Sequence, residues 1–212
     1  MPRPRSLTAA AIAAAALAVL DREGPAGLSM RAVAAELGTG TMSLYRYVAD
    51  RAELELLVVD LVLAAAGPDT REERRLPWQD RITGLAERAR QAITAHPAVI
   101  PLLLAHRHAA PNSWRWSEAV LATLSEAGLS GQRRAIALRC LVAYITGTLQ
   151  AQYLGPLAGP GTTALAALSP AAYPLLAETA QHARDIPPEQ EFRQGLDIVL
   201  GGLRAMLPDG AR

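Results

Sequence analysis

Cysteine, aromatic residues and long apolar runs are all scarce in this sequence of 212 residues. Because Cys140 is the single thiol, an internal disulfide and a zinc site built from paired cysteines are excluded, and a reducing compartment is indicated. No stretch reaches the roughly 18 apolar residues that cross a bilayer. We therefore expect a soluble, cytoplasmic protein that makes no contact with a membrane.

An apolar segment near the start, residues 9–20, resembles the core of a secretory signal because Arg3 and Arg5 precede it. The segment is mostly alanine, however, and it continues directly into a charged stretch and a second patterned segment. We interpret it as the first helix of the fold.

The residues that are abundant favour helices. Half of the sequence is hydrophobic, mainly alanine and leucine, whereas aromatic residues make up only 4%. Since strands prefer β-branched and aromatic residues, this composition predicts an all-α fold. The formal net charge of +1 excludes neither a nucleic acid nor a neutral ligand, because binding depends on where the charges lie.

The first 50 residues predict three short helices, with a glycine-containing turn between the second and the third. We predict the third helix over Thr41 to Tyr47, where Leu44 and Val48 lie four residues apart and can anchor it inward. Hydrogen-bonding and aromatic side chains then project outward, namely Thr41, Ser43, Tyr45, Arg46 and Tyr47. Such a helix can enter the major groove, where Arg46 can read guanine or hold a phosphate.

This segment resembles the DNA-binding domain of the TetR family of transcriptional regulators. The matching residues are Leu7, Thr8, Ile12, Ala15 to Leu17, Leu20, Asp21, Gly24, Leu28 to Arg31, Val33, Ala34, Leu37, Gly38 and Thr41 to Val48. The resemblance implies that the third helix lies in the major groove and that Arg51 meets a phosphate. The residues that we assign to DNA are Thr8, Ser29, Arg31, Thr41, Met42, Ser43, Tyr45, Arg46, Tyr47 and Arg51.

The sequence departs from the family pattern at one position. Many family members carry a basic residue immediately after the position of Thr8, and here that residue is Ala9. Arg3 and Arg5 are the candidates to supply the missing positive charge.

We divide the chain into a helix-turn-helix DNA-binding domain (residues 1–50), a connecting helix and charged linker (51–76), and a helical-bundle ligand-binding and dimerisation domain (77–212). Thr8, Ser29 and Asp50 are predicted N-caps. The pair Gly128 and Leu129, followed by the segment Leu141 to Gly147, is similar to tetracycline-repressor-like bodies, and the family resemblance implies a homodimer.

Two segments of the body carry more apolar surface than one small body can cover. A helix predicted over Gln132 to Tyr153 is apolar on nearly every side, and the last segment has an apolar stripe that ends at Leu207. A glycine-rich loop is expected between them, over Gly155 to Thr163. A four-helix interface with two helices from each subunit would cover both surfaces.

Polar residues inside the body are candidates for contacts with a ligand. Tyr144, Thr148 and Gln152 recur at intervals of four on one face of the long helix, and either a ligand or neighbouring protein groups can satisfy them. Cys140 is expected to be a small core residue.

The densest imidazole and aromatic cluster comprises His96, His106, His108, Trp114 and Trp116. The spacing of the histidines is not the i, i+4 spacing that aligns two imidazoles on a metal, and no carboxylate lies among them. We therefore expect no metal and no cofactor. His96, His106, Trp114 and Trp116 remain candidates for lining an apolar pocket, or else are caps and surface residues.

Together with these features, the family resemblance implies a ligand-responsive repressor that binds double-stranded DNA at a palindromic operator as a homodimer. A small apolar or aromatic effector would release it. A DNA-binding dimer without a ligand is the alternative. A helical enzyme that uses His96, His106 and His108 is a third hypothesis, but the sequence contains no nucleophile elbow, HExxH motif or P-loop to support it, so we expect no enzyme.

Overall fold

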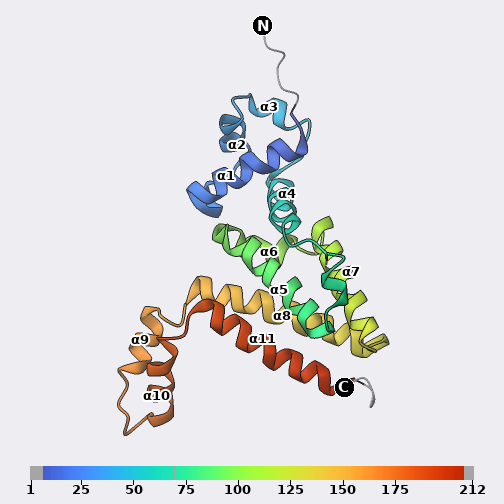
Figure 1. Cartoon of the computed structure of the whole chain (residues 1–212). Coiled ribbons are helices and arrows are strands. Elements are labelled where there is room, and N and C mark those ends of the chain that lie inside the picture. Colours follow the sequence, from blue (N-terminus) through green and yellow to red (C-terminus); the bar gives the residue numbers. More distant parts are fainter. Residues whose placement is uncertain (1–6, 69, 208–212) are drawn as a thin grey trace. The chain divides into compact units, whose positions relative to one another are not determined.

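Every regular element is helical in the residues that the computed structural model describes, 7–68 and 70–207 (Figure 1). This confirms the predicted all-α class. The chain forms two compact units. The first contains the described residues up to Leu76 together with 84–120, and the second contains 77–83 with the described residues from Leu121 onward. The domain boundaries after residues 50 and 76, which we proposed from the sequence, remain a prediction.

The first unit begins with four helices, α1 (Ala9–Gly27), α2 (Met30–Glu36), α3 (Thr41–Leu44) and α4 (Arg51–Ala64). All three predicted N-caps are confirmed, because side-chain oxygens accept a backbone N–H at 3.1 Å for Thr8, 3.2 Å for Ser29 and 2.9 Å for Asp50. Inside α1 the helix is broken at Gly24, whose φ of 72° is a conformation that other residues rarely adopt.

Helix α3 is shorter than predicted. It ends at Leu44 and not at Tyr47, and the chain continues through a turn in which the Tyr47 amide donates to the Leu44 carbonyl at 2.9 Å. The two inward-facing side chains of this segment are nevertheless buried, since Leu44 and Val48 are 0% and 1% exposed. Their burial holds the turn in place although its helical hydrogen bonds are incomplete.

The rest of the first unit consists of η1 (Glu73–Arg75), α5 (Trp78–Thr94) from Gly84 onward, η2 (Pro97–Val99), α6 (Ile100–His106) and α7 (Pro111–Glu126) up to Val120. Helix α4 packs against both α1 and α6, and α1 also contacts η2. The buried residues of α4 are Leu54, Val58, Val59, Val62 and Leu63. Helix α4 is therefore in direct contact with the first helix of the chain and with α6.

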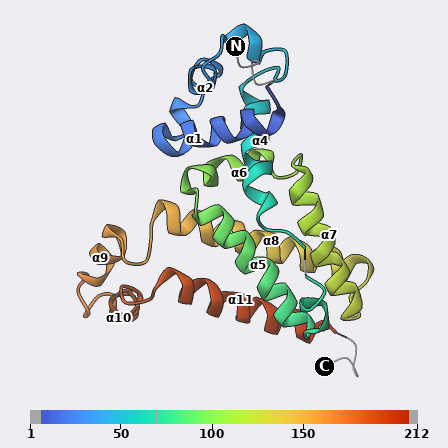
Figure 2. The same cartoon turned by 45° about the horizontal axis from the view of Figure 1, so that its top comes forward.

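The second unit contains the beginning of α5, the end of α7, and then α8 (Gly131–Leu154), α9 (Pro160–Ala166), α10 (Pro174–Ala183) and α11 (Pro188–Ala205). Helices α8 and α11 run side by side, as both views show (Figures 1 and 2). Their shared core includes Leu141, Leu149, Phe192 and Leu196, each at most 1% exposed. An ion pair between Arg81 and Glu126 links α5 to the end of α7 within this unit.

Two expectations for the body were wrong. The predicted loop over Gly155 to Thr163 contains the start of α9, because Pro160 takes the first helical position, where its fixed φ and missing N–H are tolerated. Cys140 is exposed and is not a core residue.

Within one chain, helix α8 is buried along one stripe, through Ala137, Leu141, Ile145 and Leu149. The expectation that helices of a second subunit cover its other apolar faces stays a prediction.

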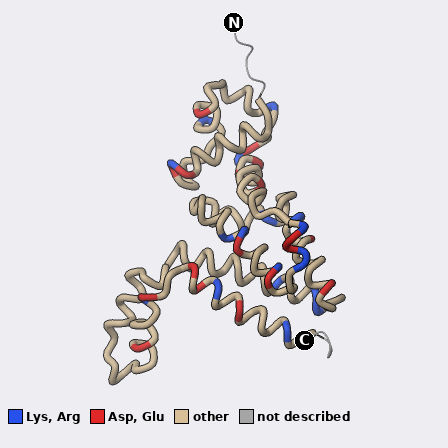
Figure 3. Tube along the Cα trace, viewed as in Figure 1, with Lys and Arg blue, Asp and Glu red and all other residues tan. Residues whose placement is uncertain are grey.

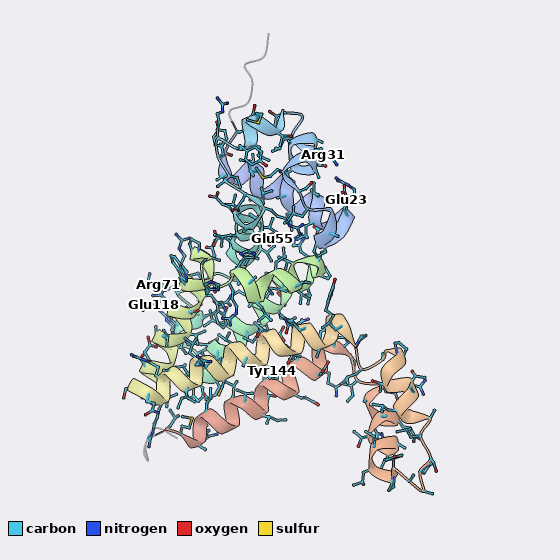
Figure 4. All side chains as sticks on the ribbon, turned by 180° about the vertical axis from the view of Figure 1, so that it is seen from behind. Glu23, Arg31, Glu55, Arg71, Glu118 and Tyr144 are labelled. Carbon is cyan, nitrogen blue, oxygen red and sulfur yellow. The ribbon has the colours of Figure 1, made fainter. Side chains whose placement is uncertain are left out.

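Tyr144 lies between α8 and α11 (Figure 4), and it approaches Gly195 closely. Its hydroxyl donates to the Phe192 carbonyl at 2.6 Å, and its ring lies 5.7 Å from that of Phe192. A Cβ at Gly195 would come within 2.9 Å of two ring carbons of Tyr144. The absence of a side chain at residue 195 is therefore what allows the two helices to approach.

We expect Gly195→Ala to lower the free energy of unfolding by about 1 to 3 kcal/mol, because the tyrosine ring cannot move without losing its hydrogen bond. Chemical denaturation measures the change. Gly161→Ala is the matched control, since a Cβ at this position in α9 meets no atom within 4 Å and should be neutral or slightly stabilising. Equal stability of the two variants would contradict the close approach.

Candidate nucleic-acid interface and effector site

The outer face of α3 and its following turn is a surface of exposed aromatic and polar side chains. Met42 is 79% exposed, Tyr45 47% and Tyr47 45%. Arg46 is also exposed, while Thr41 and Ser43 are half-buried beside them. The predicted division into an inner and an outer face is confirmed, because only Leu44 and Val48 of this segment are buried. Large apolar side chains that are exposed next to one another indicate a surface that binds another molecule.

The other residues assigned to DNA lie at helix starts. Thr8 and Ser29 use a side-chain oxygen to accept a backbone N–H, which leaves each hydroxyl hydrogen free to donate to a phosphate. Arg31 is exposed in the first turn of α2. Arg51 is already engaged, since Nη2 donates to the Pro25 carbonyl and Nε to Glu55, both at 2.7 Å. Arg3 and Arg5 lie outside the described residues.

The histidines of the predicted cluster are separated and paired with carboxylates in the first unit. His96 Nδ1 lies 2.7 Å from Asp21 Oδ2, which joins the segment before η2 to α1. His106 Nε2 lies 2.8 Å from Glu55 Oε2, which joins α6 to α4. His108 is exposed. Among the described residues no group of three or more histidine, cysteine or acidic side chains is arranged to hold a metal.

Glu55 is the acceptor in the more sheltered of these two pairs. Burial by itself would raise the pKa of this carboxyl, but the hydrogen bonds from Arg51 and His106 outweigh burial and lower it. The side chain is therefore ionised at neutral pH and can accept both hydrogen bonds. Sequence reasoning missed Asp21 and Glu55, because their partners lie 75 and 51 residues away and no local spacing connects them.

The two tryptophans differ in burial. Trp116 is 9% exposed and its indole N–H donates to the Leu85 carbonyl at 3.0 Å, so it belongs to the core of the first unit. Trp114 is 57% exposed and donates to the His108 carbonyl at 2.8 Å. Of the two, Trp114 presents the larger free aromatic surface.

The three polar candidates of α8 form a second group, which holds α8 to α11. Burial raises the pKa of the Tyr144 phenol, and a hydrogen bond with Thr148 opposes that rise. Gln152 Nε2 donates to the Pro188 carbonyl at 3.0 Å and to Glu191 Oε2 at 2.8 Å. Neighbouring groups of the chain thus satisfy the polar atoms that sequence reasoning had left open between a ligand and the protein.

Comparison with known proteins identifies both parts of the chain. Residues 12–55 match the family model described as bacterial regulatory proteins, tetR family, and residues 72–207 match the tetracyclin repressor-like C-terminal domain. The chain is 29% identical to the HTH-type transcriptional repressor DrrR1 of Streptomyces coeruleorubidus, over 97% of this chain and 80% of that protein.

Solved structures agree with the sequence matches. The TetR family protein ActR of Streptomyces coelicolor, in complex with (S)-DNPA, is 30% identical with a TM-score of 0.81, over 95% of this chain and 99% of ActR. A structure of ActR with actinorhodin gives the same TM-score at 27% identity, over 97% of this chain and 99% of ActR. Among the described residues, no helix is both long and apolar enough to cross a membrane. The chain belongs to the TetR family of helix-turn-helix transcriptional regulators and is not an enzyme.

Proposed function

We propose that this protein is a homodimeric repressor that binds a palindromic operator through α3 and is released by a small apolar or aromatic effector. The observation that carries the proposal is the outer face of α3, on which Met42, Tyr45 and Tyr47 are exposed beside Arg46. Two such faces about 34 to 36 Å apart would match successive major grooves. Because the operator is chromosomal DNA, the protein would act in the cytoplasm.

The contacts divide by chemistry. Thr41, Ser43 and Arg46 can hydrogen-bond to base edges, and Met42 with the tyrosines can contact thymine methyl groups or phosphates. Thr8, Ser29, Arg31 and Arg51 flank this surface at helix starts, where a hydroxyl or guanidinium suits a phosphate oxygen. This division assigns sequence reading to α3 and orientation on the duplex to the helix starts.

The second copy would pack on the apolar faces of α8 and α11 that one chain leaves open. Ile136 is 44% exposed and Cys140 is exposed on α8, and Ile198 is 78% exposed on α11. Between Arg139 and Glu178 the chain carries no charged residue and the tube is tan (Figure 3). Gly147 and Gly201 have no atom of their own chain within reach of an added Cβ. Small residues there permit close approach by helices of another subunit.

An effector would bind in the body. ActR has been solved with (S)-DNPA and with actinorhodin, and we propose that this chain also responds to a small organic molecule. The candidate contacts are His96, His106, Trp114 and Trp116 in the first unit, and Tyr144, Thr148 and Gln152 in the second. Coupling between effector and operator of about 1 to 3 kcal/mol would lower operator affinity roughly 5- to 150-fold.

One observation favours the alternative of a DNA-binding dimer without an effector. Each of the seven candidate contacts forms a hydrogen bond through a side-chain nitrogen or hydroxyl with another group of the same chain. A body whose polar groups are satisfied has no need of a ligand to satisfy them.

Binding of the purified protein to the DNA upstream of its own gene tests both hypotheses. We expect tight binding to a palindrome that weakens steeply with salt, since several phosphates are neutralised. The same titration is then repeated with actinorhodin and a set of aromatic compounds. Weakening by one compound supports the repressor with an effector, and binding that no compound changes supports the alternative. Failure to bind any site at low salt would contradict both.

A further inference from the structure

Three side chains of the first unit form a continuous hydrogen-bonded path from α6 to the start of α4. His106 Nε2 donates to Glu55 Oε2 at 2.8 Å, and Arg51 Nε donates to the other oxygen of the same carboxylate at 2.7 Å. Arg51 Nη2 then donates to the Pro25 carbonyl at 2.7 Å, next to the break in α1. Glu55, which Figure 4 labels, is thus the shared partner of a residue on α6 and a residue that we assign to DNA.

Solvent exposure of the side chains increases along this path, from His106 and Glu55 to Arg51. The side chains of His106 and Glu55 are 16% and 15% exposed, whereas that of Arg51 is 50% exposed. Hydrogen bonds to an ionised carboxylate are stronger than neutral ones, and shelter from water strengthens them further. The hydrogen bond between His106 and Glu55 is therefore the stronger part of the path. It fixes the carboxylate, which in turn fixes the position of the Arg51 guanidinium.

The guanidinium of Arg51 retains one free nitrogen. Nε and Nη2 are taken by Glu55 and Pro25, while Nη1 makes no hydrogen bond within residues 7–68 and 70–207. An arginine side chain loses rotamer freedom when it is fixed in one geometry. In this protein Glu55 and Pro25 already hold the Arg51 side chain in one rotamer. A phosphate that binds Nη1 therefore causes little further loss of rotamer freedom.

We propose that His106 is a positioning residue for the DNA contact of Arg51 and that it acts through Glu55. A displacement of α6 that separates the imidazole from Glu55 would release one oxygen of the carboxylate. The carboxylate would then be free to rotate, and Arg51 would lose its fixed orientation toward the phosphate. The inference rests on the proposed function, and it adds the side chains through which the body reaches a backbone contact.

A double-mutant cycle on operator binding tests the path, with Arg51→Met, His106→Leu and the double variant. We expect His106→Leu to weaken operator binding about 5- to 10-fold, within the range of measured coupling between sites. Arg51→Met should weaken binding at least as much and reduce the slope of log affinity against log salt by about 1.8, because each of the two subunits loses one phosphate contact. The double variant should bind no more weakly than Arg51→Met alone.

Conservative and matched variants separate positioning from damage to the fold. His106→Gln keeps an N–H donor and should restore most of the affinity. His108→Leu is the matched control, since His108 is exposed and its side chain makes no hydrogen bond within the described residues. Should His106→Leu fail to fold in a thermal melt, His106→Asn takes its place, because its shorter amide does not reach Glu55.

Each other result would count against the path. Additive losses in the double variant, or no loss in His106→Leu, would mean that Arg51 meets DNA independently of His106. Equal losses in His106→Leu and His106→Gln would indicate a packing role. A wild-type protein that binds no operator would overturn the proposed function and this inference together, whereas wild-type binding with an additive cycle would overturn the inference alone.

Discussion

Replacing Arg46 by alanine is expected to lower the affinity for the operator by about 1 to 3 kcal/mol and to relax the preference for one base pair. Arg46 is exposed on the outer face of α3, and a guanidinium that reads guanine makes two hydrogen bonds that no water fully replaces. Stability and oligomeric state should stay unchanged, since the side chain makes no hydrogen bond or ion pair within the described residues. Titration of operator and scrambled duplexes gives the two affinities.

The control for Arg46→Ala is Arg71→Ala, which removes the same charge from an exposed arginine outside the helix-turn-helix segment. If both variants lose affinity equally for operator and scrambled duplexes, only the net charge matters. Arg46 would then hold a phosphate or contribute nothing, and sequence reading would have to come from Thr41, Ser43 and the tyrosines.

Replacing Ile198 by aspartate is expected to convert the dimer to monomers. Ile198 is 78% exposed in the middle of α11, and two copies of the carboxylate would be buried in the proposed interface without partners, at a cost of several kcal/mol. Sedimentation at micromolar concentration measures the state of assembly. Operator affinity should fall by roughly 100-fold or more, because two half-sites no longer bind together.

Leu175→Asp is the matched control, because Leu175 is 76% exposed on α10, away from the α8 and α11 pair. This variant should sediment like the wild-type protein. If Leu175→Asp dissociates the protein while Ile198→Asp does not, the second copy packs on α10, and the proposed four-helix interface is wrong.

Local chemistry made the DNA-reading half predictable from the sequence. Caps such as Thr8, Ser29 and Asp50 act within three residues along the chain, and a glycine that adopts positive φ marks a break wherever it occurs. The inner positions of the third helix, Leu44 and Val48, follow from a spacing of four. Each of these signals depends only on neighbours in sequence, and such signals can be read without coordinates.

The body was less predictable because its signals depend on distant partners. The apolar circumference of α8 predicted burial by several helices, some of them from a second subunit, and one chain by itself buries a single stripe. The polar residues Tyr144 and Gln152 gave no indication whether a ligand or α11 would satisfy them, since their partners lie 48 and 36 residues away. The α-helix that begins at Pro160 was missed because glycine and proline around it suggested a loop.

The sequence by itself determined the all-α class, the helix-turn-helix segment and the face of α3 that remains open, because helix propensity, capping and short-range periodicity are local properties of the chain. Only the tertiary structure decided which charged and polar groups meet. Packing of helices that are far apart in sequence produces the pairs His106–Glu55 and His96–Asp21. It also produces the close contact of Tyr144 with Gly195. Nothing in the local pattern of residues encodes which distant side chain will arrive at hydrogen-bonding distance.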